Sequence, residues 1–228
     1  MTDDDKRIAA EAAVSEVQPG MLVGLGTGTT AAFAIQALGR RVREGLRIEA
    51  VATSLASERQ AHDLGIPIRD FATVASVDLT IDGADEIDDD LRAIKGAGGA
   101  MLREKVVAAA SARMVVIADG SKRVAAIGGR AVPVEIVPFA AAFVAQALEP
   151  LFASVTLRAA DERPYVTDNG NHILDCRSPR QPLWPQIEAA IQAISGICGH
   201  GLFLHQVDAA YIADRGVVSR LERSAGSS

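Results

Sequence analysis

The stretch Met21-Leu-Val-Gly-Leu-Gly-Thr-Gly-Thr-Thr30 decides the expected fold. Its apolar first half predicts a short buried strand, and the glycines and threonines that follow predict a tight turn. Beyond the turn, Ile35, Leu38 and Val42 recur at the spacing of one helix face. A strand, a glycine-rich turn and a helix together make the first half of a βαβ unit.

The same alternation continues along the chain. Buried strands are expected at residues 48–52, 77–81, 114–118 and 207–212, and helices at residues 3–17, 55–64 and 100–112. Strands separated by helices indicate parallel βαβ units. We therefore expect an α/β fold with an open, mostly parallel Rossmann-like sheet and helices on both faces, formed by residues 1–129 and 205–228.

The pattern changes near Gly128-Gly129. Strands are expected at residues 132–137 and 154–157, helices at 139–148 and 183–194, and a hairpin within 166–174. The hairpin is predicted because Asn169-Gly170 is a turn signal between apolar runs. This order predicts a smaller inserted α+β domain with an antiparallel sheet at residues 130–204. The polar tail, residues 220–228, is expected to fray.

The composition excludes several classes of protein. Against 29 Asp and Glu there are 23 Lys and Arg, which gives a net charge of −6, and 4% of the residues are aromatic. This balance offers no footprint for nucleic acid. The acidic N-terminus lacks the apolar segment of a signal peptide, and no apolar run approaches the ~20 residues of a membrane span. Cys176 and Cys198 show no C-x-x-C spacing, so we expect a protein of the reducing cytoplasm that binds neither nucleic acid nor membrane.

Polar residues directly follow several of the expected strands. They occupy residues 24–30, 53–54, 82–85 and 119–122. In a parallel sheet such loops emerge at one edge, and ligands of open α/β sheets bind there, beyond the carboxyl ends of the strands. We therefore expect these loops to converge on one cleft.

The loop at residues 24–30 suits an anion. Its glycines allow close approach of the backbone, the following helix presents free N–H groups, and the threonines add hydroxyl donors. One alternative is a tight turn with an ordinary threonine cap. Another is a dinucleotide fingerprint, because Gly26-x-Gly28-x-x-Ala31 fits its loose form and Glu49 follows at a suitable distance. A lone match of that kind is not specific.

Asp82 and Asp85 flank Gly83-Ala84, where the backbone can turn and aim both carboxylates inward. Nearby carboxylates disfavour each other's ionisation, which suits acid/base work on sugar hydroxyls. The alternatives are a helix cap or a solvated turn. We interpret Asp88-Asp89-Asp90 as such a helix cap or solvated turn.

Lys95 stands at the start of a glycine-rich segment, where it can place a positive charge and N–H donors around a developing oxyanion. Glu104 lies in the expected helix that follows and can share the site. Taken alone, Glu104 between Arg103 and Lys105 is more typical of a helix surface. Lys122 is either a phosphate clamp or a solvated helix start.

The histidines are dispersed and match no zinc motif. His200 and His205 with Cys198 are interpreted as part of a glycine-rich core turn rather than as metal ligands. There is also no G-x-S-x-G or Walker A sequence. We therefore expect neither a metal site nor nucleoside triphosphate chemistry.

Taken together, a set of ordered motifs resembles ribose-5-phosphate isomerase type A over nearly the whole chain. The motifs are Gly24-Leu-Gly-Thr-Gly-Thr-Thr-Ala31, Asp82-Gly-Ala-Asp-Glu-Ile-Asp88, Lys95-Gly-Ala-Gly-Gly-Ala-Met-Leu-Arg-Glu-Lys105, Ala118-Asp-Gly-Ser-Lys122, Pro133-Val-Glu-Ile-Val-Pro-Phe139 and Thr167-Asp-Asn-Gly-Asn171. The resemblance implies interconversion of D-ribose 5-phosphate and D-ribulose 5-phosphate in the pentose phosphate pathway. It also implies a sugar-phosphate partner, no metal or organic cofactor, and a homodimer or homotetramer.

The resemblance also implies roles for individual residues. Glu104 matches the proton acceptor. In our hypothesis, Asp82 assists ring opening, Lys95 stabilises an enediolate and Asp85 positions hydroxyls. The implied substrate-binding residues are Thr27, Gly28, Thr29, Thr30, Asp82, Gly83, Ala84, Asp85, Lys95, Gly96, Ala97, Gly98, Lys122 and, as a weaker candidate, Lys6.

Small departures and rival functions remain. Ala97 stands where the family usually has glycine, which matters only if that backbone needs a positive φ, and Thr29 stands where serine is common.

A non-catalytic sugar-phosphate sensor needs the phosphate loop but has no use for Glu104, and no helix-turn-helix segment is found. A nucleotide-dependent dehydrogenase would rest on Gly26-x-Gly28 and require NAD.

Overall fold

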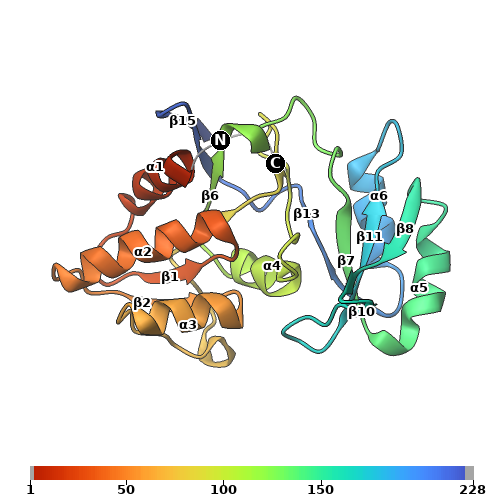
Figure 1. The fold of residues 1–228 in the computed structure, drawn as a ribbon, viewed down its shortest axis with the longest axis horizontal. Helices are drawn as coiled ribbons and strands as arrows, with labels where there is room; N and C mark the ends of the chain where they lie inside the picture. Colours follow the sequence, from red (N-terminus) through yellow and green to blue (C-terminus); the bar gives the residue numbers. More distant parts are fainter. Residues whose placement is uncertain (1–2, 224–228) are drawn as a thin grey trace.

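The computed structural model describes residues 3–223, and its larger sheet is six-stranded (Figure 1). The strand order is β15-β14-β6-β3-β1-β2. The bounds are β1 Leu22–Leu25, β2 Glu49–Ala52, β3 Leu79–Gly83, β6 Met114–Asp119, β14 Ala209–Asp214 and β15 Val217–Glu222. All neighbours pair in parallel except β14 with β15. The expected open, mostly parallel sheet is confirmed.

Helices cover both faces of this sheet. Their bounds are α1 Asp3–Val14, α2 Thr29–Arg43, α3 Leu55–Asp63 and α4 Met101–Ala109. Val115 and Ile117 of β6 point into the core under α1 and α2, whereas Met114 and Val116 point into the core on the opposite face. Successive side chains of a strand alternate between faces, so a strand with both faces covered is apolar throughout.

The second main sheet is antiparallel, as predicted. Its order is β12-β7-β11-β8, with β7 Val132–Ile136, β8 Ser154–Leu157, β11 His172–Arg177 and β12 Ile197–His200. Two helices, α5 Ala141–Leu148 and α6 Trp184–Gln192, contribute to its separate apolar core. The chain leaves the six-stranded sheet after β6 and re-enters it at β14, the strand beside β6.

Short elements connect these parts. A three-stranded sheet joins β4 Glu86–Ile87 and β5 Ala93–Ile94 to β13 Leu202–Phe203. Short 3-10 helices are η1 Phe71–Thr73, η2 Gly120–Lys122 and η3 Pro138–Ala140. The division into residues 1–129 with 205–228 and residues 130–204 stays a proposal. The separate cores of the two main sheets support it, although β13 crosses the boundary to pair with β5.

The hairpin expected within residues 166–174 is wrong. Asn169-Gly170 does form a tight turn, but residues 165–171 are not in a strand and β11 begins only at His172. Oε1 of the buried Glu135 accepts hydrogen bonds from the side chains of Thr167, Asn169 and Asn171, each at 2.9 Å. These polar contacts hold the segment as a loop, in competition with strand pairing.

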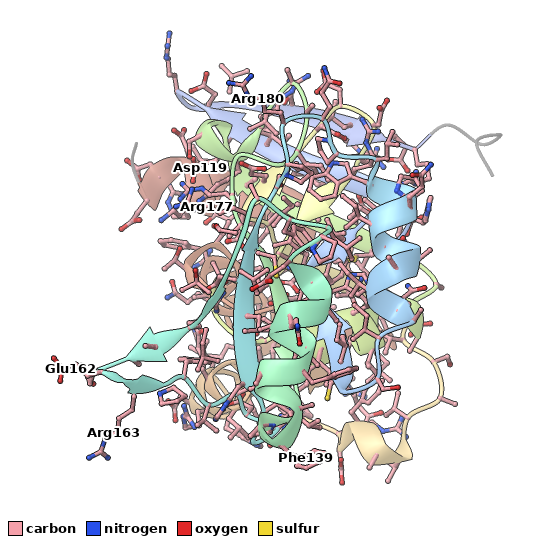
Figure 2. All side chains as sticks on the ribbon, turned by 90° about the vertical axis from the view of Figure 1, so that its right-hand side faces the viewer. Asp119, Phe139, Glu162, Arg163, Arg177 and Arg180 are labelled. Atoms are coloured by element: carbon pink, nitrogen blue, oxygen red, sulfur yellow. The ribbon has the colours of Figure 1, made fainter. Side chains whose placement is uncertain are left out.

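A hairpin forms earlier in the chain instead. Strands β9 Ala159–Ala160 and β10 Arg163–Pro164 pair across Asp161 and Glu162, which have φ values of +48° and +64°. Figure 2 shows this hairpin projecting from the body of the protein, with Glu162 and Arg163 at its tip. Positive φ values at both central residues are typical of the tight turns that suit twisted strands.

The expectation for the tail is wrong in part. Residues 220–222 belong to β15 and pair with β14, whereas residues 224–228 lie outside the described part of the chain. Between residues 3 and 223, the longest apolar helical segments are too short to cross a membrane.

Candidate active site

The loops that follow β1, β3 and β6 meet at the carboxyl end of the large sheet, around a cavity of about 100 Å³. Its lining consists of Thr27, Gly28, Thr29, Thr30, Gly83, Ala84, Asp85, Lys95, Gly96, Ala97, Gly98, Glu104 and Lys122. The structure thus brings together nearly every residue that the sequence predicted for the site. A larger hollow of about 640 Å³, which α3 and α4 help to line, contains none of them.

The first wall of the cavity is the amino end of α2. Gly28, with a φ of +99°, precedes the helix and provides no side-chain cap, so the first N–H groups of α2 are left for a ligand. Gly26 allows a close approach, because a Cβ there would lie 2.1 Å from Oδ1 of Asp82. That oxygen accepts a hydrogen bond from the N–H of Thr27 (3.0 Å). This end of the helix suits a phosphate.

A buried charged trio, Asp82, Lys95 and Glu104, forms the second wall. Their exposed fractions are 0%, 2% and 4%. The Lys95 Nζ atom lies 3.0 Å from Oδ2 of Asp82 and 3.3 Å from Oε2 of Glu104, and it also donates to the carbonyl oxygen of Gly83. One ammonium therefore serves two carboxylates, which leaves the trio one negative charge in excess when both are ionised.

Burial disfavours the ionised form of both carboxylates. Burial, and then the nearby charge of Asp82, raise the pKa of Glu104 to about 8, although Lys95 opposes the shift. Burial also raises the pKa of Asp82, against the attraction of Lys95. Burial alone would lower the pKa of Lys95, but Asp82 and Glu104 outweigh it and raise this pKa to about 12. Lys95 is therefore a permanent cation, while Glu104 can gain and lose a proton near neutral pH.

The glycine-rich loop after Lys95 closes the cavity. The N–H of Ala97 donates to Oδ2 of Asp85 (2.9 Å), which ties this loop to the one after β3. Gly96 and Gly99 carry positive φ values, but Ala97 does not, so its extra methyl group requires no strained backbone. The departure at position 97 is compatible with the local geometry.

Other expectations have mixed outcomes. Lys6 is not among the residues that line the cavity, and its Nζ lies 3.4 Å from Asp3. Asp88 lies in a turn, where it accepts hydrogen bonds from the N–H groups of Asp90 and Arg92, but it is buried rather than solvated. Glu104 departs from what its charged neighbours suggest, because its side chain is buried rather than on the helix surface.

Sequence reasoning gave no site role to three residues of the segments between β8 and β11 that contact the surroundings of the cavity. The carboxylate of Asp168 accepts from the N–H of Leu55 at the start of α3 (2.8 Å), and the Arg103 guanidinium donates to Asn169 (2.8 Å). Arg158 donates to the carbonyl oxygens of Gly96 and Ala97. Arg158 stands in no motif and has no local spacing signal, so only the tertiary structure identifies it.

Comparison with known proteins agrees with this geometry. The model of the family "Ribose 5-phosphate isomerase A (phosphoriboisomerase A)" matches residues 49–216. The chain belongs to the ribose-5-phosphate isomerase A family. Ribose-5-phosphate isomerase A of Sphingopyxis alaskensis is 54% identical over 209 residues, which cover 92% of each chain.

Solved structures of this family share the whole fold. A ribose-5-phosphate isomerase in complex with phospho-erythronic acid superposes with a TM-score of 0.94 at 33% identity, covering 98% of this chain and 100% of the other. The enzyme of Plasmodium falciparum gives a TM-score of 0.92 at 33% identity, covering 97% and 99%. The family resemblance inferred from the sequence motifs is confirmed.

Proposed function

We propose that this member of the ribose-5-phosphate isomerase A family interconverts D-ribose 5-phosphate and D-ribulose 5-phosphate, within the pentose phosphate pathway and without a metal. Membership of the family and the analogue bound by one relative support the substrate. The observation that carries the chemistry is Glu104, a buried carboxylate beside a permanent cation in a cavity at a helix amino end. Ketose formation from ribose 5-phosphate in the presence of a chelator tests the proposal. A sensor would bind the sugar without turnover, and a dehydrogenase would require NAD.

In the proposed mechanism, the substrate phosphate binds the first turn of α2, and Lys122 also lines the cavity. Glu104 removes the proton from C2 of the open-chain aldose and returns it to C1, while the hydroxyl proton of O2 passes to O1, and together these transfers convert aldose to ketose. The intermediate is an enediolate, and the Lys95 ammonium and backbone N–H groups stabilise its negative oxygen.

The two aspartates take different places in this proposal. Asp85 lines the cavity and is placed to contact sugar hydroxyls directly. Asp82 is fully buried, with Oδ1 accepting from the N–H groups of Thr27 and Gly83 and Oδ2 against Lys95. We therefore propose that Asp82 assists ring opening indirectly, by holding the Lys95 ammonium that it contacts in place.

The rate of the reaction is expected to depend on the ionisation of Glu104. A base must be deprotonated, and the pKa of about 8 means that the active form grows as pH rises through this value. We expect kcat/KM to increase from pH 6 through pH 8, where half of Glu104 is ionised, and to level above about pH 9. Initial rates between pH 5.5 and 9.5 at constant ionic strength measure this profile. A profile that is flat from pH 7 to 9 would contradict the assignment. This pH range lies above the phosphate pKa of about 6, so ionisation of the substrate does not shape the profile there.

We propose that the chain assembles as a homodimer or homotetramer. Phe139 and Phe143 are 99% and 60% exposed, on η3 and α5 of the smaller sheet's domain, and Figure 2 shows Phe139 at the rim of the molecule. Large apolar side chains left in water are typical of an interface. Light scattering should give a mass of two or four times 23.8 kDa.

A pair of charged substitutions tests where the copies meet. F139E with F143E should lower the measured mass, whereas Val217→Glu on β15, 71% exposed, should not. A wild-type monomer would contradict the assembly, and an unchanged mass for the double variant would contradict this surface. We also propose a cytoplasmic location, which the free thiols of Cys176 and Cys198 support.

A further inference from the structure

Arg158, which directly follows β8, connects the domain of the smaller sheet to the glycine-rich loop of the cavity. Its Nη1 atom donates to the carbonyl oxygens of both Gly96 (3.1 Å) and Ala97 (3.0 Å). These residues line the cavity, whereas Arg158 lines an adjoining hollow of about 650 Å³, which shares Asp85, Ala97 and Lys122 with the cavity. Arg158 itself is not among the residues that line the cavity, so its contact is with the loop.

The guanidinium of Arg158 is itself held in place. Asp175 of β11 accepts from Nε (2.9 Å) and from Nη2 (2.5 Å), which is the paired geometry of an arginine with a carboxylate. The Arg158 side chain is 16% exposed. Beside it, the Tyr165 hydroxyl donates to the carbonyl oxygen of Gly98 (3.3 Å). The group that binds the loop is thus oriented before any substrate arrives.

The large domain holds the same loop. Asp85 of the large domain accepts the N–H of Ala97, so the two domains hold consecutive peptide groups between them. Within residues 3–223, the N–H of Gly98 has no hydrogen-bond acceptor, and Gly98 lines the cavity. This N–H belongs to the same peptide group as the carbonyl oxygen of Ala97. A cation on a peptide oxygen polarises that peptide and strengthens its N–H as a donor.

We propose that Arg158, held by Asp175, is a positioning residue for the isomerisation, and that it orients and polarises the Gly96–Gly98 peptides so that the Gly98 N–H stabilises the enediolate oxygen. This inference rests on the proposed function. A donor of this kind matters most when negative charge develops, so its loss lowers kcat more than it weakens substrate binding.

Steady-state kinetics of Arg158→Gln on ribose 5-phosphate test the inference. We expect kcat to fall by about 10- to 100-fold, with KM changed by less than about 3-fold. Exchange of the C2 hydrogen in heavy water should slow in parallel, because the same step is affected. Arg158→Lys keeps the charge but loses the planar fork, and it should fall between the wild type and Arg158→Gln. Arg163→Gln, at the hairpin tip, is the matched control and should behave as the wild type.

A double-mutant cycle separates positioning from a general structural role. Asp175→Asn should lower kcat less than Arg158→Gln, and the double variant should lose no more than Arg158→Gln alone, because both changes act through one contact. A kcat within 2-fold of the wild type, a loss confined to KM, or additive losses would overturn the inference. If Arg158→Gln does not fold, as judged by circular dichroism, Arg158→Lys and Asp175→Asn decide by the same criteria. An inactive wild type would contradict the proposed function instead.

Discussion

Glu104→Gln is expected to lower kcat for ribose 5-phosphate by about 10³- to 10⁴-fold. The amide keeps the size and burial of the side chain but cannot accept the C2 proton. Because the base is used only on the path to the transition state, KM should change by no more than a few-fold. Steady-state rates measured at pH 8, together with exchange of the C2 hydrogen, check this result.

Two comparisons sharpen that experiment. Glu149→Gln replaces an exposed glutamate and should retain full activity. Glu104→Gln should also be more stable than the wild type above pH 8, because it removes a carboxylate that burial disfavours when charged. Near-normal turnover by a folded Glu104→Gln protein would show that another group is the base.

Lys95→Met is expected to abolish measurable turnover and to destabilise the fold in a pH-dependent way. The variant loses the cation that faces the enediolate oxygen, and it leaves Asp82 and Glu104 buried without their ammonium. Removal of one partner from a buried ion pair costs about 3–5 kcal/mol. Urea denaturation at pH 6 and pH 8.5 measures the effect on stability.

The direction of the pH effect follows from the carboxylates. The raised pKa of Glu104 must rise further when Lys95 is gone, so at pH 6 this group is neutral and the penalty is small. The stability deficit should therefore grow as pH increases. Lys95→Met combined with Glu104→Gln should recover much of the stability at pH 8.5 and none of the activity. Equal deficits at both pH values would contradict the buried ion pairs.

The convergence of the site could be predicted because it depends on one rule of sheet geometry. Residues 24–30, 82–85 and 119–122 each follow a parallel strand, so their meeting place was set once the strands were recognised. A continuous apolar run, rather than an alternating pattern, marks such strands when both faces are buried, as β6 illustrates with every residue buried.

The burial of Glu104 could not be deduced from its neighbours. Arg103, Glu104 and Lys105 are consecutive, but successive residues of a helix point about 100° apart. Arg103 reaches Asn169, Lys105 reaches the carbonyl oxygen of Leu202, and Glu104 alone points to Lys95. A charged run therefore conceals an inward carboxylate, and the family motif was the signal that identified it.

Contacts between the domains were beyond sequence reasoning for a different reason. Arg158 meets Gly96 across a separation of 62 residues, and no pattern within either segment records the pairing. The hairpin expected within residues 166–174 failed similarly, because Glu135 competes for its polar side chains from a distant strand. Long-range hydrogen bonds of side chains leave no local periodicity.

The adjacency of β6 and β14 also affects how this protein emerges from the ribosome. About 90 residues separate strands that lie side by side, and translation supplies them at about 5–20 residues per second. For several seconds the nascent chain carries β6 as an apolar edge with no strand to cover it, while the smaller sheet is still being made. An uncovered edge of this kind pairs readily with other chains. Slow synthesis between residues 120 and 208 should therefore increase aggregation of the newborn protein more than slow synthesis before residue 114.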